Sequence, residues 1–280
     1  MKSSEIRVAA VQLASGADPA DNLERAVALV LRAIERGATY VQLPEYVNYR
    51  GPATRYVDVA EFIPGPTTNR LAEVAKEHGV TVHVGSLLEL SAVPSKSYNT
   101  SVVIAPTGEI VATYRKGHLF DVNVPGEIVH LESKDIVAGD HLVVVDVAGF
   151  SLGLSVCFDL RFPEMYRQLC LSGARVLAVP SSFAVATGRV HWEVLLRARA
   201  IENHAYVIAA AQAGVTTEGV SSFGHSMIIG PWGEVLAESD LDGEDVLVVD
   251  VDPDEVARRR SQISVLELRR PDLYRSLPGA

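Results

Sequence analysis

The chain has 280 residues, 48% of them hydrophobic and 21% charged, and its 25 basic and 35 acidic residues give a formal net charge of −10. This is a globular composition, and it argues against a nucleic-acid partner because phosphate binding depends on clustered positive charge, which the sequence lacks. No apolar stretch approaches the length of a transmembrane helix, and the first residues lack the apolar core of a signal peptide, so we expect no membrane association.

The first half of the chain alternates strand and helix patterns. Residues 5–13 alternate polar and apolar side chains, which predicts a half-buried strand. Asp18 and Pro19 then begin a helix that ends at Gly37. The same signals predict a second helix from 67 or 68 to 78 and four strands, over 40–43, 80–88, 98–105 and 109–114.

A polar stretch from Lys116 to about Gly139 interrupts this alternation. It is irregular and contains Pro125-Gly126, so the sequence predicts a long loop. Loops of this length are usually functional or disordered.

The second half repeats the order of elements. Two apolar stretches between Val143 and Val156 flank a turn at Ala148-Gly149, and helices are predicted over 163–172, over about 191–203 and from Asp252-Pro253 onward. Strands are predicted over 176–180, 206–211, 225–229, 234–237 and 245–251. Two sheets packed face to face with helices outside would cover every amphipathic face, and no linker divides the chain, so we expect a single domain over residues 1–280.

Three predicted strand ends carry a reactive side chain: Glu45, Lys116 and Cys157. A thiol needs a base to take its proton, a buried carboxyl group can do so, and an ammonium can stabilise charge that develops on a substrate oxygen. Each residue also has an ordinary structural interpretation. Cys157 could be a small core residue, Glu45 a solvated loop carboxylate and Lys116 surface charge.

Three segments resemble the signature blocks of the nitrilase superfamily of carbon-nitrogen hydrolases. They are LPEY at 43–46, YRKGHLFDVNVPGE at 114–127 and SVCFDLRFPE at 155–164. The resemblance continues through 191–214, 223–235 and 269–274 and so covers nearly the whole chain. It implies an α/β fold built as a four-layer α-β-β-α sandwich, a homodimer or higher homo-oligomer, and no metal or organic cofactor. By the same resemblance, residues from about 256 to 280 form a tail that crosses to another subunit.

The resemblance also assigns roles. Cys157 corresponds to the nucleophile, Glu45 to the general base and Lys116 to the residue that stabilises the tetrahedral intermediate. Glu132 corresponds to a second glutamate that the family places beside this triad. Lys116 and the backbone N–H of Phe158 are then expected to hold the oxyanion while a thioester forms and ammonia leaves.

Within the superfamily, the sequence is most similar to the Nit-type amidases, which implies an acid amide such as deaminated glutathione or α-ketoglutaramate as substrate. A carboxylate on the substrate needs a cationic partner, and Arg161 or Arg189 could supply a bidentate one, with His191 also at the pocket. Arg189 stands in Gly188-Arg189-Val190-His191, where the family often has Gly-Pro-Ala-His. Each arginine could instead pair with nearby acidic residues on the surface.

Two alternatives stay open at this point. A nitrile hydrolase shares the same triad, and a non-catalytic interaction protein could retain the fold. None of the eight histidines belongs to an HExxH or a closely spaced Cys/His set, so no metal site is expected. Cys157 and Cys170 lie on either side of one predicted helical segment, which favours free thiols and a reduced, cytoplasmic protein.

Overall fold

Two six-stranded mixed sheets pack face to face in the computed structural model, which describes residues 5–124, 128–216, 219, 221–240 and 242–274. The first sheet has the order β14-β1-β2-β3-β4-β5. Its strands are β14 (Asp245–Val251), β1 (Ile6–Gln12), β2 (Tyr40–Gln42), β3 (Thr81–Leu90), β4 (Ser97–Ile104) and β5 (Ile110–Arg115). The second sheet has the order β13-β12-β11-β10-β9-β8. Its strands are β13 (Val235–Glu238), β12 (Met227–Ile229), β11 (Tyr206–Ala209), β10 (Val176–Ala178), β9 (Phe150–Leu154) and β8 (Val144–Val147).

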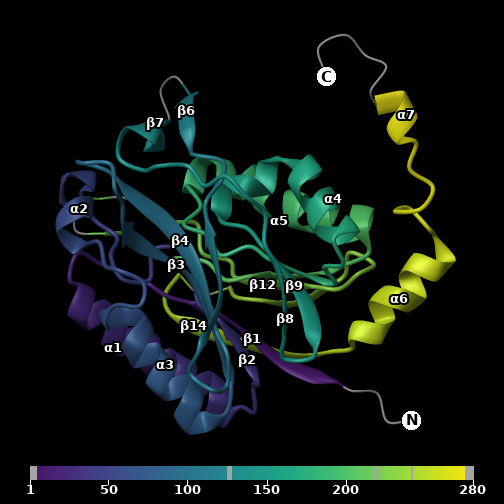
Figure 1. Ribbon diagram of the computed structural model, residues 1–280, viewed down its shortest axis with the longest axis horizontal. Coiled ribbons are helices and arrows are strands. Elements are labelled where there is room, and N and C mark those ends of the chain that lie inside the picture. Colours follow the sequence, from purple (N-terminus) through teal and green to yellow (C-terminus); the bar gives the residue numbers. More distant parts are fainter. Residues whose placement is uncertain (1–4, 125–127, 217–218, 220, 241, 275–280) are drawn as a thin grey trace.

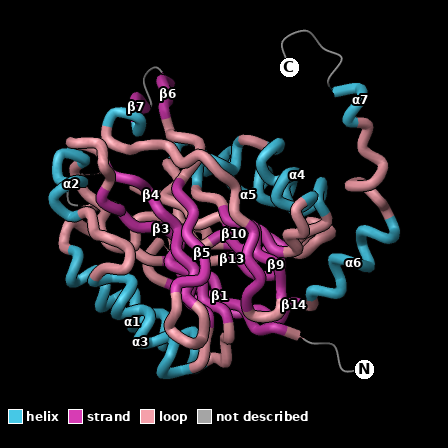
Figure 2. Tube along the Cα trace, in the orientation of Figure 1, coloured by secondary structure: helices cyan, strands magenta, loops and turns pink. Residues whose placement is uncertain are grey.

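Helices cover the outer face of each sheet. α1 (Pro19–Glu35) and α3 (Pro66–His78) pack on the first sheet, and α4 (Pro163–Leu171) and α5 (Val185–Asn203) pack on the second (Figures 1 and 2). The expected four-layer α-β-β-α sandwich is therefore confirmed. The predicted first helix is also confirmed, because the Asp18 side chain caps α1 by accepting a hydrogen bond from the N–H of Ala20 at 3.0 Å.

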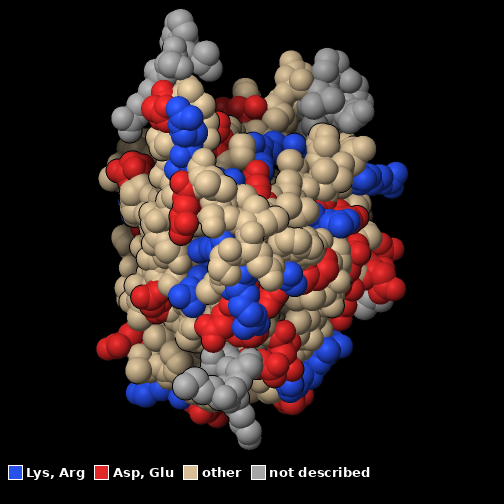
Figure 3. All heavy atoms as spheres, turned by 90° about the vertical axis from the view of Figure 1, so that its right-hand side faces the viewer, with Lys and Arg blue, Asp and Glu red and all other residues tan. Residues whose placement is uncertain are grey.

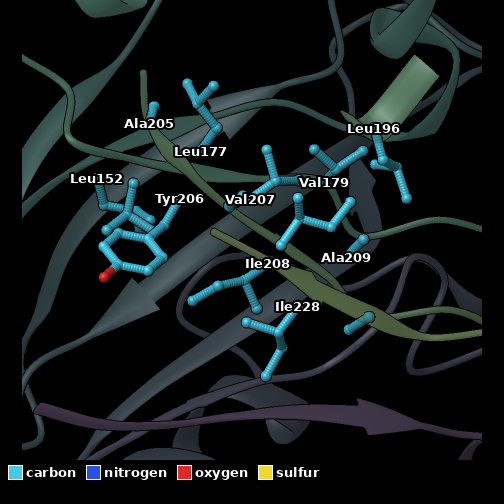
Figure 4. Close-up of a cluster of buried hydrophobic side chains, with 14 of the residues drawn as sticks. Leu152, Leu177, Val179, Leu196, Ala205, Tyr206, Val207, Ile208, Ala209 and Ile228 are labelled. Carbon is cyan, nitrogen blue, oxygen red and sulfur yellow. The ribbon is translucent and has the colours of Figure 1, made fainter. Parts of the chain in front are cut away.

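Two large apolar clusters hold these layers together. One lies beneath α1 and α3 on the outer face of the first sheet. The other fills the space between the sheets and continues beneath α5, where Leu196 packs toward Val179 and Val207 (Figure 4). Burying a side chain of this size contributes roughly 1.5–3 kcal/mol, so the clusters supply most of the stability of the layered arrangement.

The ends of the parallel strands meet at one edge of the sandwich. β1, β2 and β3 are parallel in the first sheet, and β9, β10 and β11 are parallel in the second. Beyond β1 and β11 the two sheets are joined directly, because the N–H of Ala213 donates to the carbonyl oxygen of Leu13 at 2.9 Å. The segments that follow these strands are therefore held next to one another.

A bulge in β3 makes room for the segment that follows β2. The pairing of β3 with β4 shifts between Val84 and Leu87, which places Gly85 in the irregular part of the strand. A Cβ atom on Gly85 would lie 2.0 Å from the carbonyl oxygen of Leu43 and 2.4 Å from that of Pro44. Only glycine allows this close approach of two backbones, and it fixes the position of Glu45 directly after Pro44.

Two expectations from the sequence are wrong in detail. The stretch from Lys116 to Gly139 is not an irregular loop throughout, because it contains a hairpin of β6 (Asp121–Val124) and β7 (Ile128–Leu131) and a 3-10 turn, η2 (Glu132–Lys134). Pro125-Gly126 lies outside the described residues. Helix α5 begins at Val185, six residues before the predicted start at His191. Gly188 is helical and packs against Phe223, so this glycine serves close packing and does not mark a loop.

Further short elements follow β2 and end the chain. The 3-10 turn η1 (Ala53–Arg55) and helix α2 (Tyr56–Val59) lie between β2 and α3. Near the C-terminus, α6 (Pro253–Gln262) and α7 (Pro271–Tyr274) lead away from the sandwich (Figure 1), and the last part of the expected tail, 275–280, lies outside the described residues.

Among the helices in the described ranges, none is long and apolar enough to cross a bilayer. Acidic and basic side chains alternate over the face that Figure 3 displays, without a large patch of one sign.

Candidate active site

Cys157 lies where β9 ends and a 3-10 turn, η3 (Cys157–Arg161), begins. Its φ of 49° is in the left-handed region, which costs free energy for a residue with a side chain. The surrounding structure holds this conformation, since the N–H of Cys157 donates to the carbonyl oxygen of Pro180 at 2.9 Å. The thiol is thereby fixed at the edge where the strand ends meet.

The environment of Cys157 keeps its thiol protonated in the resting protein. Burial raises the pKa of this thiol well above its ordinary value, and the negative charge of Glu45 raises it further. The positive charge of Lys116 acts in the opposite direction but is outweighed. A thiol of this kind reacts as a nucleophile only when a nearby base removes its proton.

Lys116 is buried between two carboxylates. Its Nζ atom donates to Glu45 Oε1 at 3.0 Å and to the two oxygens of Glu132 at 3.0 and 2.9 Å. Burial alone would lower the pKa of Lys116, but the charges of Glu132 and Glu45 outweigh it and hold that pKa well above its ordinary value. The site therefore contains a buried ammonium ion that the two carboxylates keep charged.

The two glutamates differ in their other hydrogen bonds. Glu45 accepts from Asn99 Nδ2 at 2.9 Å on Oε1 and from the N–H of Ser182 at 2.7 Å on Oε2. Glu132 accepts from the N–H of Phe120 at 2.6 Å and from the hydroxyl of Tyr46 at 3.0 Å. Burial would raise the pKa of Glu132, but the Lys116 ammonium and the donated hydrogen bonds lower it below its ordinary value. Glu132 is thus held as a carboxylate.

Asp159 connects the segment that carries Cys157 with the segment that carries Lys116. Its carboxylate is fully buried. Oδ2 accepts from the N–H of Val156 and the hydroxyl of Tyr114, both at 2.8 Å, and Oδ1 accepts from the N–H of His118 at 3.0 Å. Sequence reasoning missed this residue, although its place two residues after the candidate nucleophile is a signal that could have found it.

Glu45, Lys116, Glu132 and Cys157 all face one cavity of about 590 Å³. The rings of Phe120, Phe158 and Phe183 form apolar parts of its wall. The structure therefore brings together all four residues that the sequence singled out for the chemistry. A cavity of this volume accommodates a small organic molecule with its reacting group at the thiol.

Arg161 also lines this cavity. Its guanidinium lies 5.2 Å from the ring centroid of Phe183 and 5.7 Å from that of Phe158. Burial lowers the pKa of Arg161, and a negative charge on Cys157 would act in the opposite direction. Arg161 is therefore the cation of this pocket that lies beside apolar rings.

The structure separates the other two residues proposed for substrate binding. His191 does not line the cavity but contacts Arg161, whose Nη1 donates to His191 Nδ1 at 3.2 Å. Arg189 is exposed and is absent from the described lining of the cavity. Among the residues with described positions, no group of three or more His, Cys, Asp or Glu side chains could hold a metal ion.

Comparison with known proteins places this chain in a family. A family model for carbon-nitrogen hydrolases matches residues 7–261. The chain belongs to that family. The resemblance of the three signature segments to the nitrilase superfamily is thereby confirmed, and the family consists of enzymes that act on carbon-nitrogen bonds other than peptide bonds.

The chain is similar in sequence to amidases from an animal and from a bacterium. The chain is 40% identical to "Omega-amidase NIT2" of Mus musculus over 271 residues, which is 97% of each protein. It is 41% identical to "Deaminated glutathione amidase" of Synechocystis sp. (strain PCC 6803 / GT-S) over 267 residues, 93% of this chain and 97% of that protein.

Solved structures agree with the fold. The NitFhit protein of C. elegans has a TM-score of 0.91 and 35% identity, and the match covers 98% of this chain and 67% of that one. Saccharomyces cerevisiae Nit3, described as a member of branch 10 of the nitrilase superfamily, has a TM-score of 0.84 and 29% identity, with 95% and 97% of the two chains covered. The expected placement in the Nit-type branch is confirmed by these relatives.

Proposed function

We propose that this protein is an amidase that hydrolyses a small, carboxylate-bearing amide to a carboxylate and ammonia through a thioester on Cys157. The observation that carries the proposal is the Lys116 ammonium, held between Glu45 and Glu132 in the cavity that also exposes the Cys157 thiol. Two of the named relatives are amidases, one an omega-amidase and one a deaminated glutathione amidase, which supports the same reaction class.

In the acylation step, Glu45 accepts the proton of the Cys157 thiol, and the thiolate attacks the amide carbon. The electron pair of the C=O bond moves to the oxygen, where Lys116 and the N–H of Phe158 stabilise it. When the carbonyl re-forms, the C–N bond breaks, and Glu45 returns its proton to the leaving nitrogen. Ammonia departs, and the acyl group remains on sulfur as a thioester.

In the deacylation step, Glu45 takes a proton from a water molecule that attacks the thioester carbon. The same two donors stabilise the second tetrahedral intermediate, and the C–S bond breaks as the carboxylate product forms. The sulfur regains a proton, which restores the resting thiol. This cycle needs one base that gains a proton and gives it up twice, and the charge of Glu45 acts on Cys157.

Arg161 is proposed to bind the carboxylate at the other end of the substrate. Among the described residues, no carboxylate lies within ion-pair distance of its guanidinium, and the apolar rings beside it reduce its hydration. A planar, always charged guanidinium binds a carboxylate in a bidentate manner. Replacing Arg161 with leucine is expected to raise KM for an acid amide about 10- to 100-fold while changing KM for a neutral amide much less.

We also propose that the protein works in the cytoplasm as a homodimer or higher homo-oligomer with the segment 256–280 as an inter-subunit tail. Two buried free cysteines suit a reducing compartment. On α5, Val190 and Val194 are 65% and 67% exposed, and Leu268 in the tail is 75% exposed. A second copy of the chain would cover these apolar side chains. Size-exclusion chromatography with light scattering tests this assembly, and a monomer at micromolar concentration would contradict it.

The proposed activity is tested by measuring ammonia release from deaminated glutathione, α-ketoglutaramate, succinamate, simple aliphatic amides and nitriles. The wild type should hydrolyse an acid amide, Cys157→Ala should lose this activity by several orders of magnitude, and Cys170→Ala should retain most of it. Turnover of nitriles alone would identify a nitrile hydrolase. Equal turnover in wild type and Cys157→Ala would overturn the proposal.

A further inference from the structure

Tyr46 directly follows the proposed base in the chain and adopts an unusual backbone conformation. Its φ of 58° lies in the left-handed region, which is rare for a bulky side chain. Two hydrogen bonds hold it there. The N–H of Tyr46 donates to Ser86 Oγ at 3.0 Å, and Gln212 Nε2 donates to the carbonyl oxygen of Tyr46 at 3.4 Å. A strained residue that the surrounding structure fixes in this way is a candidate for a functional role.

The strained backbone directs the phenol of Tyr46 toward Glu132. Its hydroxyl donates to Glu132 Oε1 at 3.0 Å, and its ring lines the active-site cavity. We propose that Tyr46 is a positioning residue that keeps Glu132 a fixed carboxylate against Lys116, so that Glu45 is the carboxyl group that carries the proton during catalysis. This inference rests on the proposed amidase function.

The hydrogen bonds of the two carboxylates favour this division of roles. Each oxygen of Glu132 accepts from Lys116 and from at least one further donor, the Tyr46 hydroxyl and Asn99 Nδ2 on Oε1 and the Phe120 N–H on Oε2. If Glu132 were protonated, its O–H would point at a hydrogen-bond donor on whichever oxygen carried it. The protonated oxygen would also no longer accept the hydrogen bonds that these donors make to it. Oε2 of Glu45 accepts the Ser182 N–H, and the Glu45 carboxylate is also hydrogen-bonded with the Cys157 thiol whose proton it is proposed to take.

The phenol of Tyr46 acts as a neutral donor to Glu132. Burial raises the pKa of Tyr46 well above its ordinary value, and the charge of Glu132 raises it further, so the hydroxyl stays protonated at any working pH. A neutral donor stabilises the charged form of Glu132 without adding charge of its own. When two neighbouring carboxyl groups receive such unequal support, one remains ionised and the other exchanges protons.

Tyr46→Phe removes the hydroxyl and retains the ring. We expect kcat to fall about 10-fold, with KM little changed, because Glu132 then holds Lys116 less well in the transition state. The acidic limb of the kcat/KM profile should move to higher pH, because Glu132 without this donor binds a proton more readily. The other titratable groups that face Glu132 are Lys116, Glu45 and Tyr56.

The matched control is Tyr49→Phe, three residues away. The Tyr49 hydroxyl donates to the carbonyl oxygen of Pro52, and Tyr49 lies outside the described lining of the cavity. It should leave kcat and the pH profile unchanged. A double-mutant cycle with Glu132→Gln provides a second measurement. If Tyr46 acts through Glu132, adding Tyr46→Phe to Glu132→Gln should lower kcat further by less than about 2-fold, although the single Tyr46→Phe change costs about 10-fold.

The outcomes separate the inference from the function on which it rests. An active wild type whose Tyr46→Phe variant retains its kcat and its acidic limb would overturn the role of Tyr46 alone. Full additivity in the cycle would also overturn it, because Tyr46 would then act independently of Glu132. A wild type that hydrolyses no amide at all would overturn the proposed function and this inference together.

Discussion

Replacing Asp159 with alanine is expected to destabilise the protein by about 3–6 kcal/mol. The magnitude follows from the two fully buried donors that would lose their acceptor, the N–H of Val156 and the hydroxyl of Tyr114, because hydrogen bonds to a charged group contribute about 1.5–3 kcal/mol each. The N–H and ring Nδ1 of His118 also bond Oδ1 of Asp159, but His118 is only partly buried and its side chain is 36% exposed, so water can replace these bonds. A loss of this size is a large fraction of the stability of an ordinary protein.

Urea unfolding followed by tryptophan fluorescence measures this loss. The matched control is Asp140→Ala, since Asp140 also bonds a histidine but its side chain is 94% exposed, and its removal should not shift the unfolding midpoint measurably. Asp159→Asn retains one acceptor oxygen and should fall between the two. A loss below about 1 kcal/mol for Asp159→Ala would show that Asp159 does not stabilise the fold in this way, because the buried donors would then have found other acceptors.

Two further predictions concern residues beneath the site. Burial lowers the pKa of His83 to about 3, so its contribution to stability is complete above pH 6.5 and is lost as the pH falls toward 3. From pH 7.5 to 5 the wild type should lose about 2 kcal/mol more than His83→Gln in urea unfolding, and parallel losses would disprove the assignment. Gly85→Ala should destabilise the protein by about 1–3 kcal/mol, because its Cβ would lie 2.0 Å from the carbonyl oxygen of Leu43. Gly243 has open space around it, so Gly243→Ala should not destabilise the protein, and equal unfolding midpoints for the two variants would contradict this prediction.

The central residues of the site could be predicted because their positions depend on strand ends. Glu45 follows β2, Lys116 follows β5 and Cys157 follows β9, and apolar strand patterns with a reactive residue after them are visible in a single sequence. The directions of the strands then bring those ends to one edge of the sandwich. Glu132 was predicted only from the family resemblance, since it lies in a 3-10 turn with no periodic pattern around it.

The supporting contacts could not be predicted because they depend on distances between segments far apart in the chain. Asp159 reaches Tyr114 across 45 positions, and Asn99 reaches Glu45 across 54. Nothing in the local sequence of either partner indicates such a contact. Likewise, the sequence offers Arg161 and Arg189 equally as partners for a substrate carboxylate. Only the packing of η3 and α5 around the cavity shows that Arg161 lines it and Arg189 is exposed.

The identity of the nucleophile is tested most directly by mass spectrometry of protein quenched in acid during turnover of an acid amide. We expect the wild type and Cys170→Ala to carry an adduct with the mass of the substrate less ammonia, located on the peptide that contains Cys157. Cys157→Ala should carry no adduct and release no ammonia. An adduct on any other residue, or ammonia release that persists in Cys157→Ala, would show that Cys157 is not the nucleophile.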